Sequence, residues 1–162
     1  MTLTLKVILK KIMNPEELIT KYLDHYVWRY ADTNAKRSTI LTFKTGAVIF
    51  NEKTKSVEST GTSHIPLNFR YDDSDHAKRS IHAEDDALDK IRHFNDKSNL
   101  SILVYTLNAN MTGHVGSSRP CQGCAERLVR ANLSRVYYIE RDNSGVWCLN
   151  RTTPAILIGR SF

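Results

Sequence analysis

Two short helix starts, far apart in the sequence, limit what this chain can fold into more than any other feature. One reads RPCQGC and places Cys121 and Cys124 three positions apart behind Pro120. Proline is favoured at the first position of a helix, so both thiols are expected on the first turn of a helix that Pro120 begins. A CxxC turn suits a redox couple, half of a structural zinc site or part of a catalytic metal centre. The spacing alone leaves all three open.

The other helix start supplies what the cysteine pair lacks. It reads SIHAEDDAL, and His82 and Glu84 lie at its beginning, directly after a long polar connection. His82 and the thiolates of Cys121 and Cys124 make three ligands that suit zinc, with a fourth position left for water. The positive end of a helix helps to keep such thiols deprotonated. Glu84 is then free to take a proton from the zinc-bound water and return it to a substrate.

The competing interpretations explain less of this pattern. A redox pair accounts for neither His82 nor Glu84, and a structural zinc site wants a fourth protein ligand. The candidates for that ligand are His114, in a glycine-containing loop, and Cys148, in an apolar stretch where a buried thiol usually only packs. We therefore favour a catalytic zinc site, with a structural zinc site as the main alternative.

Length and composition indicate one ordinary globular domain. The chain has 162 residues, and we predict a single domain over 1–162 in which residues 1–13 are a peripheral N-terminal extension. No apolar run approaches the roughly 20 residues of a membrane span. Lysines interrupt the first 13 residues and no small-residue cleavage site follows, so we do not expect secretion. Three cysteines make no disulfide framework, which favours a cytoplasmic protein.

Apolar periodicity and turn residues predict a mixed α/β chain. The last two strands are joined by NSG, which is too short for a parallel crossover, so they should form an antiparallel hairpin. The segment from Pro154 could add a short strand or pack as an apolar tail. The expected elements are a helix over about 15–30, strands ending near 50 and over about 56–61, a helix from 82, a strand over 100–107, a helix from 120, and strands over 135–142 and 146–151, with irregular segments over 62–80 and 108–118.

The first expected helix carries Tyr22, Tyr26 and Tyr30 at helical spacing. We expect these rings to pack against the rest of the protein and not to form a platform for stacked bases.

The pattern H-x-E followed by P-C-x-x-C is the signature of zinc nucleobase deaminases. With it, the sequence resembles the cytidine deaminase superfamily, and most closely its deoxycytidylate deaminases. The resemblance covers roughly residues 35–142 and includes the GAVI core of the first strand, the GTSHIP loop, HAEDDAL and the cysteine helix. It implies a three-layer α/β/α sandwich with a mixed five-stranded sheet. It also implies the reaction: a zinc-bound hydroxide attacks C4 of cytosine, Glu84 shuttles protons, and ammonia leaves a uracil product.

The same resemblance implies residues that hold the substrate. Backbone N–H groups of Ala83 and Cys121 are expected to bind the edge of the base. Ser63 stands where the family offers an asparagine to the sugar, and Arg119 lies beside the pocket, where it could meet a phosphate. The predicted site therefore consists of the zinc ligands His82, Cys121 and Cys124, the catalytic Glu84, and the substrate-binding residues Ser63, Ala83 and Arg119.

Charge leaves the substrate class open. A net charge of +6 and a pI near 9.3 fit phosphate-bearing partners, but a solvated mixed surface explains them equally well. The same holds for the other possible phosphate contacts, Arg70, Tyr71, Lys78 and Arg79. No arginine-rich run or regular aromatic series marks a nucleic-acid track, so we favour a free cytosine nucleotide or nucleoside.

Two alternatives to that function remain. The first is a deaminase of the same chemistry that acts on cytosine or adenine in single-stranded DNA or RNA. The second is a non-catalytic zinc-binding interaction protein, against which Glu84 argues. Superfamily relatives are usually oligomeric, so we expect a homo-oligomer.

Overall fold

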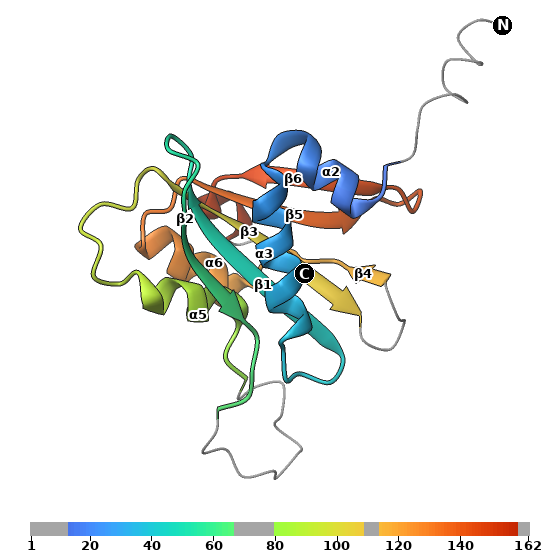
Figure 1. Cartoon of the computed structure of the whole chain (residues 1–162), viewed down its shortest axis with the longest axis horizontal. Coiled ribbons are helices and arrows are strands. Elements are labelled where there is room, and N and C mark those ends of the chain that lie inside the picture. The colour runs from blue at the N-terminus through green and yellow to red at the C-terminus, as the bar shows by residue number, and fades with distance from the viewer. Residues whose placement is uncertain (1–12, 67–79, 109–113, 159–162) are drawn as a thin grey trace, which may run out of the picture.

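One open mixed sheet, with helices on both faces, organises the chain (Figure 1). The computed structural model describes residues 13–66, 80–108 and 114–158. The strands run in the order β2-β1-β3-β5-β6, and β4 pairs with β3 outside this path. Among these strands β3 and β5 are parallel, and the other pairs are antiparallel. The strand bounds are β1 Phe43–Asn51, β2 Val57–Thr62, β3 Leu100–Asn108, β4 His114–Gly116, β5 Arg135–Arg141 and β6 Trp147–Thr152.

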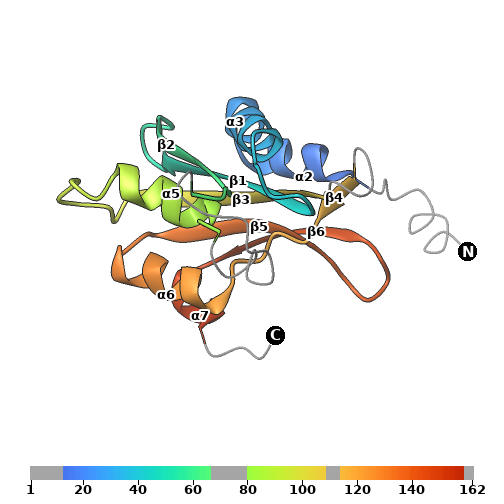
Figure 2. The same cartoon turned by 90° about the horizontal axis from the view of Figure 1, so that it is seen from below.

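The helices form two layers, and each layer has its own core cluster. The described helices are α2 Pro15–Tyr22, α3 His25–Lys36, α5 Ala83–Lys90, α6 Gln122–Arg130 and α7 Pro154–Leu157. Figure 2 shows α2 and α3 on one side of the sheet and α6 and α7 on the other. Ala83 and Ala87 of α5 share the core cluster of α6 and α7. The predicted three-layer α/β/α sandwich is therefore confirmed, as is the antiparallel hairpin of β5 and β6. None of the described helices is long and apolar enough to cross a membrane.

The N-terminal helical region differs from the single helix predicted over about 15–30. The chain is extended at Leu23 and Asp24, which separates α2 from α3. Asn14 begins α2 as predicted, because its side chain accepts a hydrogen bond from the Glu17 N–H at 2.8 Å. Aspartate disfavours a helix interior and favours the position just before a helix, which Asp24 occupies. The apolar spacing continues across this break, so the pattern did not reveal it.

The prediction that Tyr22, Tyr26 and Tyr30 pack against the protein is wrong, because all three side chains are exposed. Neighbouring helical residues point about 100° apart, so Tyr26 and Tyr30 lie beside the face that α3 places on the sheet, while Tyr22 is the last residue of α2. That face consists of Val27, Ala31, Asn34 and Ala35.

Two other segments also depart from the predictions. The sheet has six strands and not five, because His114–Gly116 forms β4 on the end of β3, with Gly116 opposite Thr106. The segment from Pro154 forms a four-residue helix, α7, in place of a strand or tail, since proline occupies its first turn. Apart from Met13, the predicted N-terminal extension over 1–13 lies outside the described residues.

Two glycines set the distance between the sheet and its helices. A Cβ atom on Gly46 of β1 would lie 2.2 Å from the Ala31 carbonyl oxygen of α3. A Cβ atom on Gly61 of β2 would lie 2.0 Å from the Ala83 carbonyl oxygen of α5. Only glycine therefore lets these two helices rest on the backbone of the strands, on opposite faces of the sheet. Gly61 thereby positions the first turn of α5, which carries the predicted catalytic glutamate.

Candidate metal centre

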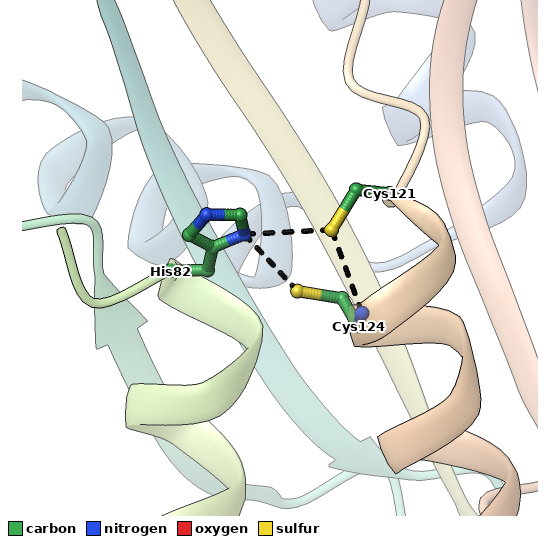
Figure 3. Close-up of side chains that lie close together, drawn as sticks. All are labelled: His82, Cys121 and Cys124. Atoms are coloured by element: carbon green, nitrogen blue, oxygen red, sulfur yellow. Dashed lines mark hydrogen bonds between the residues drawn. The ribbon is translucent and has the colours of Figure 1, made fainter. Parts of the chain in front are cut away.

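Three ligand atoms from two helices converge on one point (Figure 3). The His82 Nδ1 atom lies 3.2 Å from the Cys124 sulfur and 3.6 Å from the Cys121 sulfur. All three atoms lie within 4.8 Å of one another. Ligands about 2.0 to 2.3 Å from a tetrahedral zinc ion are roughly 3.3 to 3.8 Å apart, so this trio fits zinc. The fourth corner of such a tetrahedron is left for water.

The three ligands stand at the N-termini of two helices. His82 precedes α5 and Cys121 precedes α6, each with an extended backbone. The Cys121 sulfur accepts a hydrogen bond from the Cys124 N–H at 3.5 Å. The prediction that Pro120 begins this helix is thus off by two residues, because Cys121 caps it and Gln122 is its first residue. The positive ends of two helices consequently face the anionic ligands.

The two thiols differ in acidity, because each affects the deprotonation of the other. The pKa of Cys121 falls to about 3, because Cys124 and His82 both donate hydrogen bonds to its sulfur. The pKa of Cys124 is raised, first by that hydrogen bond to Cys121 and then by burial. A divalent cation between the two sulfurs would reduce this difference in acidity, because it stabilises both thiolates at once.

Glu84 is buried directly beside the ligands, with a relative exposure of 4%. Burial raises the pKa of its carboxyl group, while a hydrogen bond with Cys124 and the charge of His82 act in the opposite direction. A carboxyl group whose pKa is raised by burial holds a proton more readily than an exposed one and can pass it on again. This property suits the predicted proton shuttle.

Arg127 links the two helices that carry the ligands. Its Nε atom donates to the Asp85 carboxylate of α5, and its Nη2 atom lies 3.8 Å from the Cys124 sulfur. Neither Arg127 nor Asp85 was among the predicted site residues. A signal existed for Arg127, because a side chain three positions after Cys124 on a helix lies over the same face. The partner Asp85 is 42 positions away, and local spacing does not reveal it.

A cavity of about 320 Å³ opens onto this centre. It is lined by His82, Glu84 and Cys121 and by the predicted substrate-binding residues Ser63, Ala83 and Arg119. Its size is at the lower end of the range for sites that bind small molecules. Sequence reasoning did not find the remaining lining residues, which are Ile40, Thr42, Phe43, Thr45, Ser80, Val104, Thr106, Ser117 and Ser118.

The Ser63 hydroxyl already takes part in an internal network. It accepts a hydrogen bond from the Thr45 N–H at 2.9 Å and bonds the Ser38 hydroxyl at 2.7 Å. Ser38 donates in turn to the Ser63 carbonyl oxygen at 2.6 Å, so Ser63 is the donor between the two hydroxyls. One lone pair of the Ser63 oxygen remains for a substrate, and contact with a sugar stays a prediction.

Neither candidate for a fourth protein ligand joins the centre among the described side chains. The Cys148 thiol lies in β6 and donates to the Val146 carbonyl oxygen at 3.7 Å. His114 contributes its backbone to β4, and its side chain lies outside what the structure describes. The other possible phosphate contacts, Arg70, Tyr71, Lys78 and Arg79, also lie outside the described residues.

The sequence over residues 21–140 matches the family model of the cytidine and deoxycytidylate deaminase zinc-binding region. The chain belongs to this family. The match spans both helix starts and, with the ligand geometry, confirms zinc as the cofactor. No curated protein matches the sequence significantly.

Solved structures of the family share the fold at low sequence identity. Cytidine deaminase from Burkholderia pseudomallei is 16% identical, with a TM-score of 0.57 over 86% of this chain and 98% of the other. Cytidine deaminase from Mycobacterium leprae is also 16% identical, with a TM-score of 0.51 over 83% and 96% of the two chains. The dCMP deaminase of cyanophage S-TIM5 is 18% identical, with a TM-score of 0.47 over 76% and 82%. The cytidine deaminases support the cytidine deaminase-like fold.

Proposed function

We propose that this protein is a zinc-dependent hydrolytic deaminase that converts a cytosine nucleotide or nucleoside, of the dCMP or cytidine type, to the uracil product and ammonia. The observation that carries the proposal is the buried Glu84 beside the ligand trio, at a cavity of about 320 Å³. A structural zinc site has no use for a carboxyl group in that place. Family membership supports deamination, and the base and its sugar are our inference.

The zinc ligands and Glu84 have separate roles in the proposed reaction. When held by His82, Cys121 and Cys124, zinc would supply an activated water molecule for attack on C4 of the base. Glu84 would take one proton from that water and pass it to the base, and would then carry the second proton of the same water to the departing ammonia. Water and the cytosine compound are consumed, and ammonia and the uracil compound are formed. Burial of Glu84 keeps bulk water away from these transfers.

The remaining lining residues are suited to orient the substrate. The Ala83 N–H stands in the first turn of α5, where backbone donors have no partner within the helix. We assign it to the edge of the base, and Ser63 to the sugar. Arg119 supplies a positive charge in the same cavity, which favours a nucleotide over a nucleoside.

A second candidate is the same reaction on cytosine or adenine in a single-stranded polynucleotide. The observation that favours it is a basic and aromatic groove near the cavity, described below. A non-catalytic zinc-binding interaction protein is the third candidate, and the buried Glu84 disfavours it. Two zinc-bound thiolates fit a reducing compartment, so we place the protein in the cytoplasm. We also infer a homo-oligomer, which light scattering after size-exclusion chromatography would test.

A Glu84→Gln variant tests the proposed function directly. Both proteins should contain one zinc ion per chain, because Glu84 is not a ligand, and only the wild type should release ammonia. Cytidine, deoxycytidine, dCMP, dCTP, and single-stranded DNA and RNA are offered in parallel. Activity that survives in the variant would remove Glu84 as the proton shuttle. The absence of turnover with every cytosine substrate would refute the proposed reaction, and adenine and guanine substrates come next.

A further inference from the structure

Helix α3 lies on the face of the sheet opposite α6 and α7 (Figure 2). Residues of this helix, Arg37 directly after it and Thr60 of β2 line a groove. Its volume is about 400 Å³. Two tyrosine rings and two guanidinium groups dominate its lining, which consists of Tyr26, Arg29, Tyr30, Thr33, Asn34, Arg37 and Thr60. We call this set the α3 groove.

The two rings of the α3 groove are accessible. Tyr26 has a relative exposure of 38% and Tyr30 one of 48%, which are high values for aromatic side chains. The spacing of four residues places both on the same side of α3. Two exposed rings one helical turn apart offer neighbouring surfaces for stacking.

The charge around these rings is positive. Arg29 and Arg37 are exposed and line the same groove, and no carboxylate stands among its described lining residues. The acidic residue on α3, Asp32, is bound to Lys36 at 2.7 Å and lines a different cavity, while Asp24, the residue directly before α3, has its carboxylate beside Tyr26. Asp24 offsets only one of the two guanidinium charges, so the surroundings of the groove keep a net positive charge that attracts an anion.

Alternating stackable rings and guanidinium groups suit single-stranded nucleic acid, whose bases stack on aromatic side chains while basic groups meet its phosphates. We propose that the α3 groove binds single-stranded nucleic acid and leads the strand to the mouth of the catalytic cavity. A second copy of this chain fits the groove less well. A two-fold interface would set the basic patches of both copies against each other, and the Asp24 carboxylate beside Tyr26 would offset only part of that positive charge.

The groove and the catalytic cavity share their structural support. Thr62 Oγ1 bonds the Asn34 carbonyl oxygen at 3.1 Å, and the next residue, Ser63, lines the catalytic cavity. At the other side, Arg37 is followed directly by Ser38, which donates to the Ser63 carbonyl oxygen. On the proposed path, a nucleic-acid strand that leaves the groove at Arg37 would continue past Ile40 and Phe43, which line the catalytic cavity.

Exposed apolar side chains continue from that point. Leu41 has a relative exposure of 70% and Phe43 one of 54%, and Phe43 also lines the catalytic cavity. Phe43 is therefore placed to meet a base at the cavity mouth. Delivery of a base to the cavity rests on the proposed deaminase function, whereas binding in the groove does not.

Binding is measured by fluorescence anisotropy with a labelled oligodeoxythymidylate of about 15 nucleotides, which contains no base for the proposed reaction. Tyr26→Ser/Tyr30→Ser should weaken binding at least about tenfold, since loss of stacking with one base costs that much. Tyr26→Phe/Tyr30→Phe keeps the rings and should bind like the wild type. Zinc-loaded Glu84→Gln should also bind normally.

The charge contribution has its own matched control. Arg29→Gln/Arg37→Gln should reduce the slope of log K against log salt by about 1.4, or about 0.7 for each lost phosphate contact. Arg92→Gln/Arg130→Gln makes the same change in net charge at exposed positions outside the groove, and should leave the slope nearly unchanged. Circular dichroism confirms folding of each variant.

Three outcomes would overturn the proposal. The first is equal binding by the serine and phenylalanine pairs, and the second is an equal change of salt slope in both arginine pairs. The third is a dimer that dissociates in the Tyr26→Ser/Tyr30→Ser variant, which would make a second copy the occupant. Oligonucleotide binding without deamination of any substrate would refute the proposed function and leave this binding surface standing.

Discussion

Replacement of Gly61 by alanine should displace helix α5, which carries Glu84, and not unfold the protein. The new Cβ atom would lie 2.0 Å from the Ala83 carbonyl oxygen, where ordinary contact begins at 3.4 Å. Strand β2 and helix α5 must therefore separate by about 1.4 Å along this line, and Glu84 moves with α5. A misplacement of about 1 Å can cost about 100-fold in rate, so kcat/KM should fall by about that factor.

The stability cost of the same change is modest. Overpacking costs about 1 to 3 kcal/mol, and alanine in a strand recovers about 0.5 to 1 kcal/mol relative to glycine. The net loss of at most about 2.5 kcal/mol should lower Tm by no more than roughly 10 °C. Urea titration gives the free energy of unfolding, and ammonia release from the best cytosine substrate gives kcat/KM.

Gly46→Ala is the matched control for Gly61→Ala. Its Cβ atom would meet the Ala31 carbonyl oxygen at 2.2 Å, so the stability cost should be similar. It displaces α3, which carries no zinc ligand, and kcat/KM should fall far less. Equal losses of activity in both variants would refute the claim that Gly61 acts through the position of α5, and so would full activity in Gly61→Ala.

The other predictions concern the second link between α5 and α6, the metal and a buried tyrosine. Arg127→Gln should lower kcat about tenfold, which corresponds to about 1.4 kcal/mol. Its Tm should change little, because the ion pair with Asp85 is partly exposed. Arg127→Lys should retain more activity, and an unchanged kcat in Arg127→Gln would count against the link between the helices. Removal of zinc by a chelator should abolish ammonia release and lower the Tm measured by calorimetry, and added zinc should restore the activity and the Tm. An unchanged Tm would contradict a metal held by three residues at two helices. Burial raises the pKa of Tyr105 to about 12, so the folded state holds this proton more tightly than the unfolded state does, and the associated stability is present below pH 10 and lost as the pH rises to 12. Tyr105→Phe should reduce this loss in urea titrations across that range, and an identical slope in both proteins would argue against it.

The centre was largely predictable because its parts are local. His82 and Glu84 are close in sequence, as are Cys121 and Cys124, and each pair lies at the predicted start of a helix. Because His82 and the two cysteines are all ligands that suit zinc, the two pairs can be assigned to one site without knowledge of the sheet. The same locality made the β5–β6 hairpin predictable, since its turn is too short for any other connection.

The features that sequence reasoning missed depend on contacts between distant segments. β4 is three residues long and lacks a pattern of its own; β3 supplies its hydrogen bonds. Tyr26 and Tyr30 are exposed because the neighbouring Val27 and Ala31 occupy the side of α3 that packs on the sheet, and the sequence spacing does not show which side that is. The polar network of Ser38, Ser63 and Thr45 joins residues from three separate segments. Such contacts become visible only when the strands have been assembled.

The division of the ligands between α5 and α6 gives zinc a structural consequence as well as a chemical one. His82 follows the β1–β2 hairpin in the chain, while Cys121 and Cys124 precede the β5–β6 hairpin. The ion therefore acts as a cross-link between the first and second halves of the sandwich, in the way that a disulfide joins distant parts of a secreted domain. Zinc should therefore add to the contacts that the shared core cluster already makes between α5 and α6, and the metal centre is complete only when both halves have folded.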